Sequence, residues 1–183
     1  MIRKRITMFG DSLTAGYGLR LSEALPVRLQ RELEQLGVPA AVTNAGVSGD
    51  TTEDGLRRID QDVAADTELC IVALGANDMM QQIATETIGN NIDAMLDKLS
   101  ARSIPAMICG MRAPPSYGPY AIAFEEVFGD VARRHGAPID PFLLEGVALT
   151  PAYTLPDRIH PSARGVDAIA RRLAPRVVAA LGA

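Results

Sequence analysis

The sequence is poor in the residue types that several kinds of binding site require. It contains no tryptophan, and aromatic residues make up 4% of its 183 residues, so a carbohydrate site built on stacked rings has little support. Lys4 and Lys98 are the only lysines, which leaves few candidates for a lysine that binds phosphate or forms a Schiff base. The formal net charge of −4 argues against a nucleic-acid partner, because such proteins usually present a basic face.

Long apolar stretches are also absent. No run of about 18 apolar residues occurs, so we expect no membrane-spanning helix. The basic start, Arg3 to Arg5, is similar to the head of an export signal, but no apolar stretch of about 7–15 residues follows it. We therefore expect a cytoplasmic protein as the sequence stands, or a periplasmic or secreted one if a leader has been removed.

Cysteine is scarce as well. Cys70 and Cys109 are the only two, and both lie in apolar runs that are typical of strands. We interpret them as buried thiols rather than as a disulfide or a metal pair. The sequence indicates no metal site, and its length suits a single domain that spans residues 1–183.

What the sequence does contain is a regular alternation of short apolar runs and longer segments with helical periodicity. The runs predict strands at residues 5–9, 41–44, 69–74, 106–109 and 138–140. Apolar residues at spacings of three and four predict helices at residues 22–36, 52–65, 85–101, 120–135 and 162–181, the last with Ser162 as N-cap and a kink at Pro175. This alternation predicts an α/β fold, a doubly wound parallel sheet with helices on both faces.

Ligands of such folds bind at the carboxyl ends of the strands, so the residues there are functional candidates. The first strand runs into GDSLTAG at residues 10–16. A serine at a strand-to-helix turn is exposed, and the backbone amide of Ser12 can donate to an oxyanion. The alternative is that Ser12 or Asp11 only caps a short helix, which the motif fits as well.

Two further polar clusters follow the next strands. The second strand leads into residues 46–52, where glycines allow a close approach of the backbone and the Gly49 amide can reach an oxyanion. Capping of the next helix by Asp50 or Thr51 is the ordinary alternative. The third strand leads into Asn77, whose neutral amide can stabilise an oxyanion without titrating, although a simple turn would use the same residue types.

Two histidines are available as a base. His135 precedes a glycine at a predicted helix end, where we expect it to interact with the last carbonyls and to be structural. His160 lies in a loop before the last helix, with Asp157 three residues earlier. A carboxylate so placed fixes the tautomer of the imidazole and stabilises the imidazolium, as a serine nucleophile requires. The alternative is that His160 is only a solvated loop residue.

The combination is more specific than any of its parts. The four clusters supply a nucleophile, a base, an orienting acid and oxyanion donors in one chain. We therefore predict a serine hydrolase that cleaves small esters or thioesters and needs no metal or organic cofactor.

At these residues the chain resembles the SGNH hydrolases, also called GDSL esterases/lipases, and within them the bacterial acyl-CoA thioesterase, arylesterase and lysophospholipase group. The resemblance covers nearly the whole chain and is carried by GDSL at residues 10–13, SGDT at 48–51, GAND at 75–78 and DRIHP at 157–161. RAPPSYG at residues 112–118 matches a loop that lies beside the acyl pocket in relatives. Arg158 is a departure, because close relatives often have glycine there.

The resemblance implies a flavodoxin-like three-layer α/β/α sandwich whose five-stranded parallel sheet has the order 2-1-3-4-5. It also implies a catalytic triad of Ser12, Asp157 and His160, and an oxyanion hole of the Ser12 amide, the Gly49 amide and the Asn77 side chain. Gly46 is a rival for Gly49, which the match favours because the family's glycine precedes Asp-Thr.

Apolar side chains after the third and fourth strands are candidates for an acyl pocket: Met79, Met111, Pro114 and Tyr117. Met80 follows the third strand as well, and filling of the core is an equal or better alternative for Met80 and Met111. An open groove of flexible side chains suits short- to medium-chain acyl groups, and the resemblance adds acyl thioesters and lysophospholipids to the candidate substrates.

Two other functions are weighed against this one. A carbohydrate acetylesterase would use the same scaffold, but the few aromatic residues disfavour it. A non-catalytic nucleotide- or flavin-binding domain would share the sheet, but GxGxxG and a phosphate-loop lysine are missing.

Overall fold

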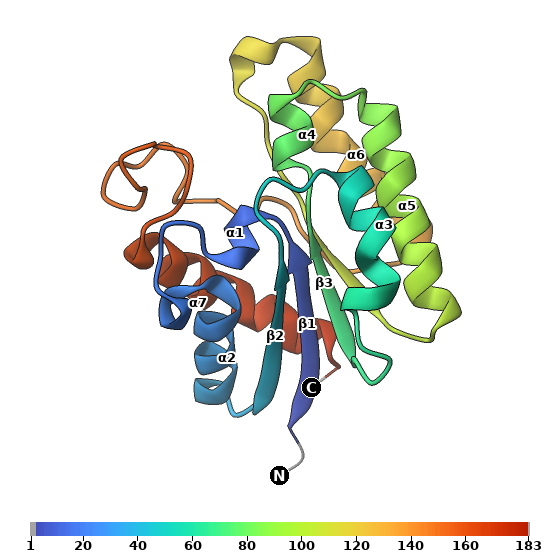
Figure 1. Ribbon diagram of the computed structural model, residues 1–183, viewed down its shortest axis with the longest axis vertical. Coiled ribbons are helices and arrows are strands. Elements are labelled where there is room, and N and C mark those ends of the chain that lie inside the picture. The colour runs from blue at the N-terminus through green and yellow to red at the C-terminus, as the bar shows by residue number, and fades with distance from the viewer. Residues whose placement is uncertain (1–2, 183) are drawn as a thin grey trace.

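The computed structural model describes residues 3–182 and contains one parallel sheet with helices on both faces (Figure 1). The sheet order is β2-β1-β3-β4-β5, and all four strand pairs are parallel. The strands are β1 (Lys4–Gly10), β2 (Ala40–Gly46), β3 (Leu69–Ala73), β4 (Ala106–Cys109) and β5 (Ile139–Asp140). The predicted α/β fold and its strand order 2-1-3-4-5 are confirmed.

The helices form the two outer layers. On one face α2 (Leu25–Gln35) packs against α7 (Ala163–Ala180), and on the other α5 (Thr85–Ala101) lies between α3 (Thr52–Asp62) and α6 (Pro119–His135) (Figure 1). Single helical turns that the apolar pattern did not predict follow two strands, α1 (Ser12–Ala15) and α4 (Ala76–Met80). Short 3-10 turns occupy Leu21–Glu23 and Pro115–Tyr117.

Three predicted helix ends can be compared with the structure. The helix predicted from residue 22 begins at Leu25, because Ala24 is extended (ψ 147°) and Pro26 sits in the first turn, where no N–H is needed. The helix predicted to residue 65 ends at Asp62, because Val63 is extended (φ −99°, ψ 110°). Ser162 caps α7 as predicted, since its Oγ accepts from the Gly165 N–H at 3.3 Å.

The core lies between the sheet and these layers. All five residues of β3 are buried, as expected for the central strand of a sheet covered on both faces. Cys70 and Cys109 are free and buried, which confirms the interpretation as buried thiols. Burial raises the pKa of Cys70 to about 12 and that of Cys109 further, so neither is a ready thiolate. Of the helices within residues 3–182, none has both the length and the apolar character needed to cross a membrane.

Candidate active site

The strand register brings three strand ends to the same level. Gly10 of β1 pairs with Gly46 of β2 and with Ala73 of β3, so the segments that follow these residues start side by side at the carboxyl edge of the sheet. α1 crosses this edge closely: a Cβ on Gly46 would lie 2.3 Å from the backbone nitrogen of Ala15. The glycine therefore lets the turn that carries Ser12 lie against the end of β2.

Ser12, His160 and Asp157 lie in hydrogen-bonding contact. Ser12 Oγ is 3.0 Å from His160 Nε2, and His160 Nδ1 is 2.6 Å from Asp157 Oδ2. The long segment between β5 and α7, orange in Figure 1, thus brings two residues from near the carboxyl terminus to the end of the first strand. The arrangement joins a hydroxyl, an imidazole and a carboxylate in one chain of contacts.

The electrostatics of Asp157 assign the proton on the imidazole. The hydrogen bond from the His160 side chain, followed by those from the backbone N–H groups of Ile159 (2.9 Å) and His160 (3.0 Å), lowers the pKa of Asp157 to about 2. An ionised carboxylate only accepts hydrogen bonds, so Nδ1 of His160 carries the hydrogen and donates it. Nε2 is then free to accept from the hydroxyl of Ser12.

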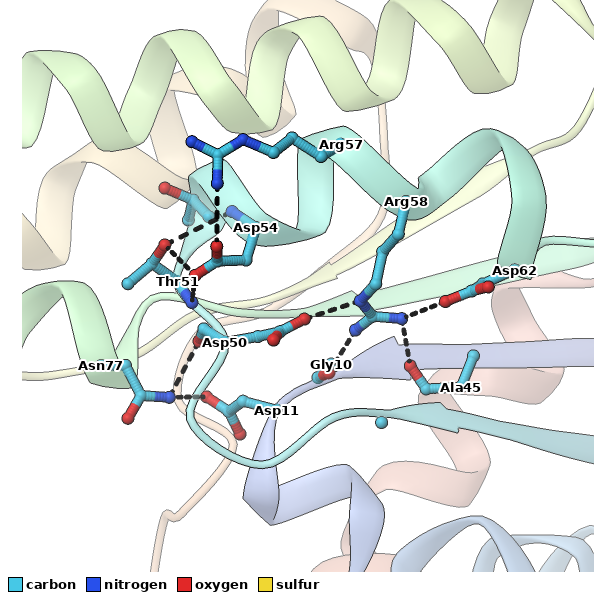
Figure 2. A network of polar contacts seen from close by, with 12 residues as sticks. Gly10, Asp11, Ala45, Asp50, Thr51, Asp54, Arg57, Arg58, Asp62 and Asn77 are labelled. Carbon is cyan, nitrogen blue, oxygen red and sulfur yellow. Dashed lines mark hydrogen bonds and ion pairs between the residues drawn. The ribbon is translucent and has the colours of Figure 1, made fainter.

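The three residues expected to supply oxyanion donors, Ser12, Gly49 and Asn77, follow the ends of three different strands, β1, β2 and β3. The backbone amides of Ser12 and Gly49 donate no hydrogen bond within residues 3–182. The side-chain amide of Asn77 donates to the carbonyl of Asp50 at 2.8 Å and makes a long contact of 3.4 Å to Asp11 Oδ2 (Figure 2). A contact of 3.4 Å is weak, so this N–H can turn to a better acceptor.

The backbone separates Gly49 from its rival Gly46. The Gly46 amide already donates to Oδ1 of Asn44 at 3.0 Å. Gly49 has φ of +92°, a left-handed conformation that favours glycine. The free amide and the backbone conformation both favour Gly49 as an oxyanion donor.

A cavity of about 420 Å³ opens next to these groups. Ser12, Asn77 and His160 lie on its wall, and most of the remaining wall is apolar. The wall residues that surround them are Leu13, Ala76, Met79, Met80, Met111, Arg112, Ala113, Pro114, Pro115, Phe142, Leu144, Ala148, Leu149, Arg158 and Ile159.

The four residues expected in the acyl pocket have different positions. Met79, Met111 and Pro114 line the cavity, and Met111 also belongs to the core, with 3% of its surface exposed. Tyr117 is not among the lining residues, and its ring centroid lies 6.1 Å from that of Tyr120. Tyr120 belongs to α6, so the ring of Tyr117 lies next to that helix.

Arg158 also lies on the cavity wall. Its φ of +58° is in the left-handed region, where a side chain is strained and glycine is not. Arg158 therefore adds a cationic side chain at the cavity, at a backbone position that glycine would occupy without strain.

Two residues that the sequence reasoning missed support the site. The ring of Tyr17 packs on that of His160, with centroids 4.4 Å apart and planes at 33°. Asp78, next to Asn77, is fully buried and accepts from the N–H (2.9 Å) and the hydroxyl (2.6 Å) of Thr52. Asp78 thereby joins α4 to the start of α3. The motif GAND contained this signal, because a carboxylate directly after Asn77 needs partners if it is buried.

His135 has a different partner from the one expected. Its Nε2 lies 3.0 Å from Oδ1 of Asp93 on α5, and not on the carbonyls at the end of α6. The hydrogen bonds from His135 and Arg134 lower the pKa of Asp93 against the opposing effect of burial. The expectation of a carbonyl contact was wrong, because the side chain crosses to the neighbouring helix.

Comparisons with known proteins agree with this geometry. The sequence profile of the GDSL-like Lipase/Acylhydrolase family matches residues 8–168. The chain is 35% identical to "Esterase TesA" of Pseudomonas aeruginosa over 159 residues, which cover 86% of this chain and 79% of that protein. It is 29% identical to "Thioesterase 1/protease 1/lysophospholipase L1" of Escherichia coli over 178 residues, 94% of this chain and 84% of that one.

Solved structures give the same result. The crystal structure of AlinE4, described as an SGNH-hydrolase family esterase, superposes with a TM-score of 0.82 at 40% identity and covers 100% of this chain and 99% of that chain. The profile match spans most of the chain and all four motif clusters. This protein is therefore a member of the GDSL-like lipase/acylhydrolase family.

Proposed function

We propose that this chain hydrolyses short- to medium-chain carboxylic esters, and thioesters of the same acyl groups, through an acyl-enzyme on Ser12. The observation that carries the proposal is the contact chain from Ser12 Oγ to His160 (3.0 Å) and on to Asp157 (2.6 Å), at the wall of an apolar cavity. An oriented imidazole next to a serine hydroxyl is the arrangement that activates a serine nucleophile.

In the first half of the reaction Ser12 attacks the substrate carbonyl. His160 Nε2 takes the hydroxyl proton as the new bond forms, and Asp157 stabilises the resulting imidazolium. The amides of Ser12 and Gly49 and the side chain of Asn77 donate to the tetrahedral oxyanion. Each such donor contributes about 3–4 kcal/mol to lowering the barrier. His160 then gives the proton to the leaving alkoxide or thiolate, and the acyl-enzyme remains.

In the second half water replaces the leaving group. His160, neutral again, takes a proton from water, which attacks the acyl carbonyl of the Ser12 ester. Collapse of the second tetrahedral intermediate returns the proton to Ser12 Oγ and releases the carboxylic acid. The balance is one ester and one water consumed, and one acid and one alcohol or thiol formed.

The form of the cavity supports the acyl preference. Met79, Met80 and Met111 are flexible apolar side chains on its wall. Leu149 and Ile159 on the same wall are 84% and 53% exposed, so the cavity is open at its mouth. An open cavity of about 420 Å³ accepts short and medium acyl chains and leaves the leaving group in solvent.

The open mouth also affects which leaving groups the cavity accepts. Because the wall does not enclose the leaving group, it leaves room for alcohols and thiols of different sizes. The name of the relative from Escherichia coli combines a thioesterase with a lysophospholipase, which supports the inclusion of thioesters and lysophospholipids here. Sugar acetates are disfavoured, because Phe142 offers the one phenyl ring on the described cavity wall.

A series of p-nitrophenyl esters from acetate to palmitate tests the proposal, with the same acyl groups repeated as thioesters of N-acetylcysteamine. We expect the highest kcat/KM in the shorter half of the series. Ser12→Ala should abolish turnover and labelling by a fluorophosphonate. The protein should stay folded, because the one hydrogen bond of Ser12 Oγ within residues 3–182 is the contact with His160.

Ser116→Ala is the matched control, since Ser116 is exposed and lies outside the cavity wall. It should react and turn over like the wild type. Turnover that survives in Ser12→Ala would refute the nucleophile, and an optimum at palmitate would refute the chain-length preference.

A further inference from the structure

One arginine on α3 contacts the ends of two strands and the loop that carries Gly49. Arg58 Nε donates to Asp50 Oδ2 at 2.6 Å, and Nη2 donates to the carbonyl of Gly10 at 2.8 Å (Figure 2). Nη1 donates to the carbonyl of Ala45 at 3.0 Å and to Asp62 on its own helix at 2.8 Å. The Arg58 side chain is only 16% exposed, so these contacts are largely shielded from water.

The acceptors of Arg58 adjoin the proposed oxyanion donors in the sequence. Gly10 lies two residues before Ser12, and its carbonyl is the last of β1. Asp50 directly follows Gly49, and its carboxylate is itself only 13% exposed. One guanidinium therefore contacts the backbone carbonyl two residues before Ser12 and the carboxylate of the residue that follows Gly49.

The third donor is linked through Asp50. While the carboxylate of Asp50 accepts from Arg58, its backbone carbonyl accepts from the Asn77 side-chain amide at 2.8 Å (Figure 2). A shift of Asp50 would move the anchor of Asn77 together with the Gly49 amide. Arg58 is thus bonded to residues next to Ser12 and Gly49, and through Asp50 it is connected to Asn77.

We propose that Arg58 is the positioning residue that sets the geometry of the oxyanion hole, an inference that rests on the proposed roles of Ser12, Gly49 and Asn77. Arg58 does not line the cavity, so it acts through the backbone and not on the substrate. Oxyanion stabilisation depends on donors held at fixed positions before the reaction, and a displacement of about 1 Å can cost about a hundredfold in rate.

The planar guanidinium suits this role. Arginine presents five donors in a rigid fork, whereas lysine has one ammonium group on a flexible stem. The guanidinium carbon of Arg58 also lies 4.1 Å from the ring centroid of Phe9, so one face of the group rests on a core aromatic. A lysine would keep the charge opposite Asp50 and lose the simultaneous contact with both strand carbonyls.

The neighbouring Arg57 gives a matched control. Its side chain is 65% exposed and pairs only with Glu53 and Asp54 of the same helix, away from the strand ends in Figure 2. Loss of Arg57 removes an arginine and its ion pairs from α3 and reaches the Gly49 loop only indirectly, because its partner Asp54 also accepts from the N–H of Thr51 at 3.0 Å.

The test compares the wild type with Arg58→Gln, Arg58→Lys and Arg57→Gln on p-nitrophenyl butyrate, at a temperature where thermal melts show every variant folded. We expect Arg58→Gln to lower kcat by about ten- to a hundredfold with KM within about twofold, because the interaction matters in the transition state. Arg58→Lys should fall between it and the wild type, and Arg57→Gln should match the wild type. The ¹H–¹⁵N signal of the Gly49 amide should shift in Arg58→Gln and stay in place in Arg57→Gln.

Three outcomes overturn the inference. In the first, Arg58→Gln keeps the wild-type kcat. In the second, its kcat falls but its KM rises by a similar factor, and in the third, the signal of the Gly49 amide does not shift. If Arg58→Gln does not fold, Arg58→Lys decides, and a wild-type kcat in that variant refutes the role. If the wild type itself lacks hydrolysis that depends on Ser12, the proposed function fails, while the Gly49 amide signal still tests whether Arg58 positions this loop.

Discussion

Asp11, the residue before the proposed nucleophile, makes the stability of this protein depend on pH in an unusual direction. Its carboxyl is fully buried. Oδ1 accepts from the Leu13 N–H at 2.9 Å and so caps α1, and Oδ2 has only the long contact with Asn77. Burial, opposed by the hydrogen bond from Leu13, raises the pKa of Asp11 from 3.8 to about 6.

The magnitude follows from this shift. The rise from 3.8 to about 6 is roughly two pH units, and each unit corresponds to about 1.4 kcal/mol, so the total is about 3 kcal/mol. Between pH 4 and 6 the folded protein keeps the proton that the unfolded chain has lost. The free energy of unfolding contributed by Asp11 is therefore fully present below about pH 4 and falls as the pH rises to about 6.

Asp11→Asn isolates this contribution. Asparagine keeps the oxygen that accepts from Leu13 but does not titrate, so any fixed cost of the substitution is independent of pH. We expect the unfolding free energy of the wild type minus that of Asp11→Asn to fall by about 2.5 kcal/mol between pH 4 and 7, because a small part of the total is already lost at pH 4.

Urea unfolding followed by circular dichroism, in half-unit steps from pH 4 to 8, measures this difference. Asp97→Asn, which removes one exposed carboxylate, is the control for the change in net charge. A difference between wild type and Asp11→Asn that stays flat across this range, or that rises with pH, would refute the reasoning.

Two predictions concern catalysis directly. Asn77→Ala should lower kcat by about 10²- to 10³-fold with little change in KM, because the amide acts on the oxyanion of the transition state; a loss confined to KM, in steady-state assays, would contradict this. Since the pKa of Asp157 is about 2, its carboxylate is ionised throughout the range from pH 4 to 9. Asp157→Asn should therefore lower kcat by about 10³- to 10⁴-fold at every pH in that range, and a pH–rate profile in which the loss disappears at some pH would contradict the role.

Local patterns predicted the sheet well. The all-apolar run around β3 marked the central strand, because a strand covered on both faces has no polar side. Element ends were less accurate: β2 extends to Ala40–Gly46, and Ala24 separates a 3-10 turn from α2. The single turns α1 and α4 were missed as helices, because four or five residues show no periodicity.

The partners of individual side chains were less predictable. His135 was expected on nearby carbonyls but contacts Asp93, 42 residues away in the chain. Tyr17 stands in the first motif, yet nothing local indicates that its ring packs on His160. Such contacts depend on how helices and loops pack, and the sequence pattern carries no direct record of that packing.

The sequence by itself determined the fold class and the chemical groups of the candidate site, because strand–helix alternation and short polar motifs are local properties of a chain. Only the tertiary structure decided how these groups meet. The register that pairs Gly10 with Gly46 and Ala73 puts three loops at one edge, and Arg58 joins the ends of β1 and β2 and the loop after β2 through three hydrogen bonds. These contacts join residues that are distant in the sequence. They therefore form only when the strands have paired and the helices have packed on the sheet, which also excludes water from around them.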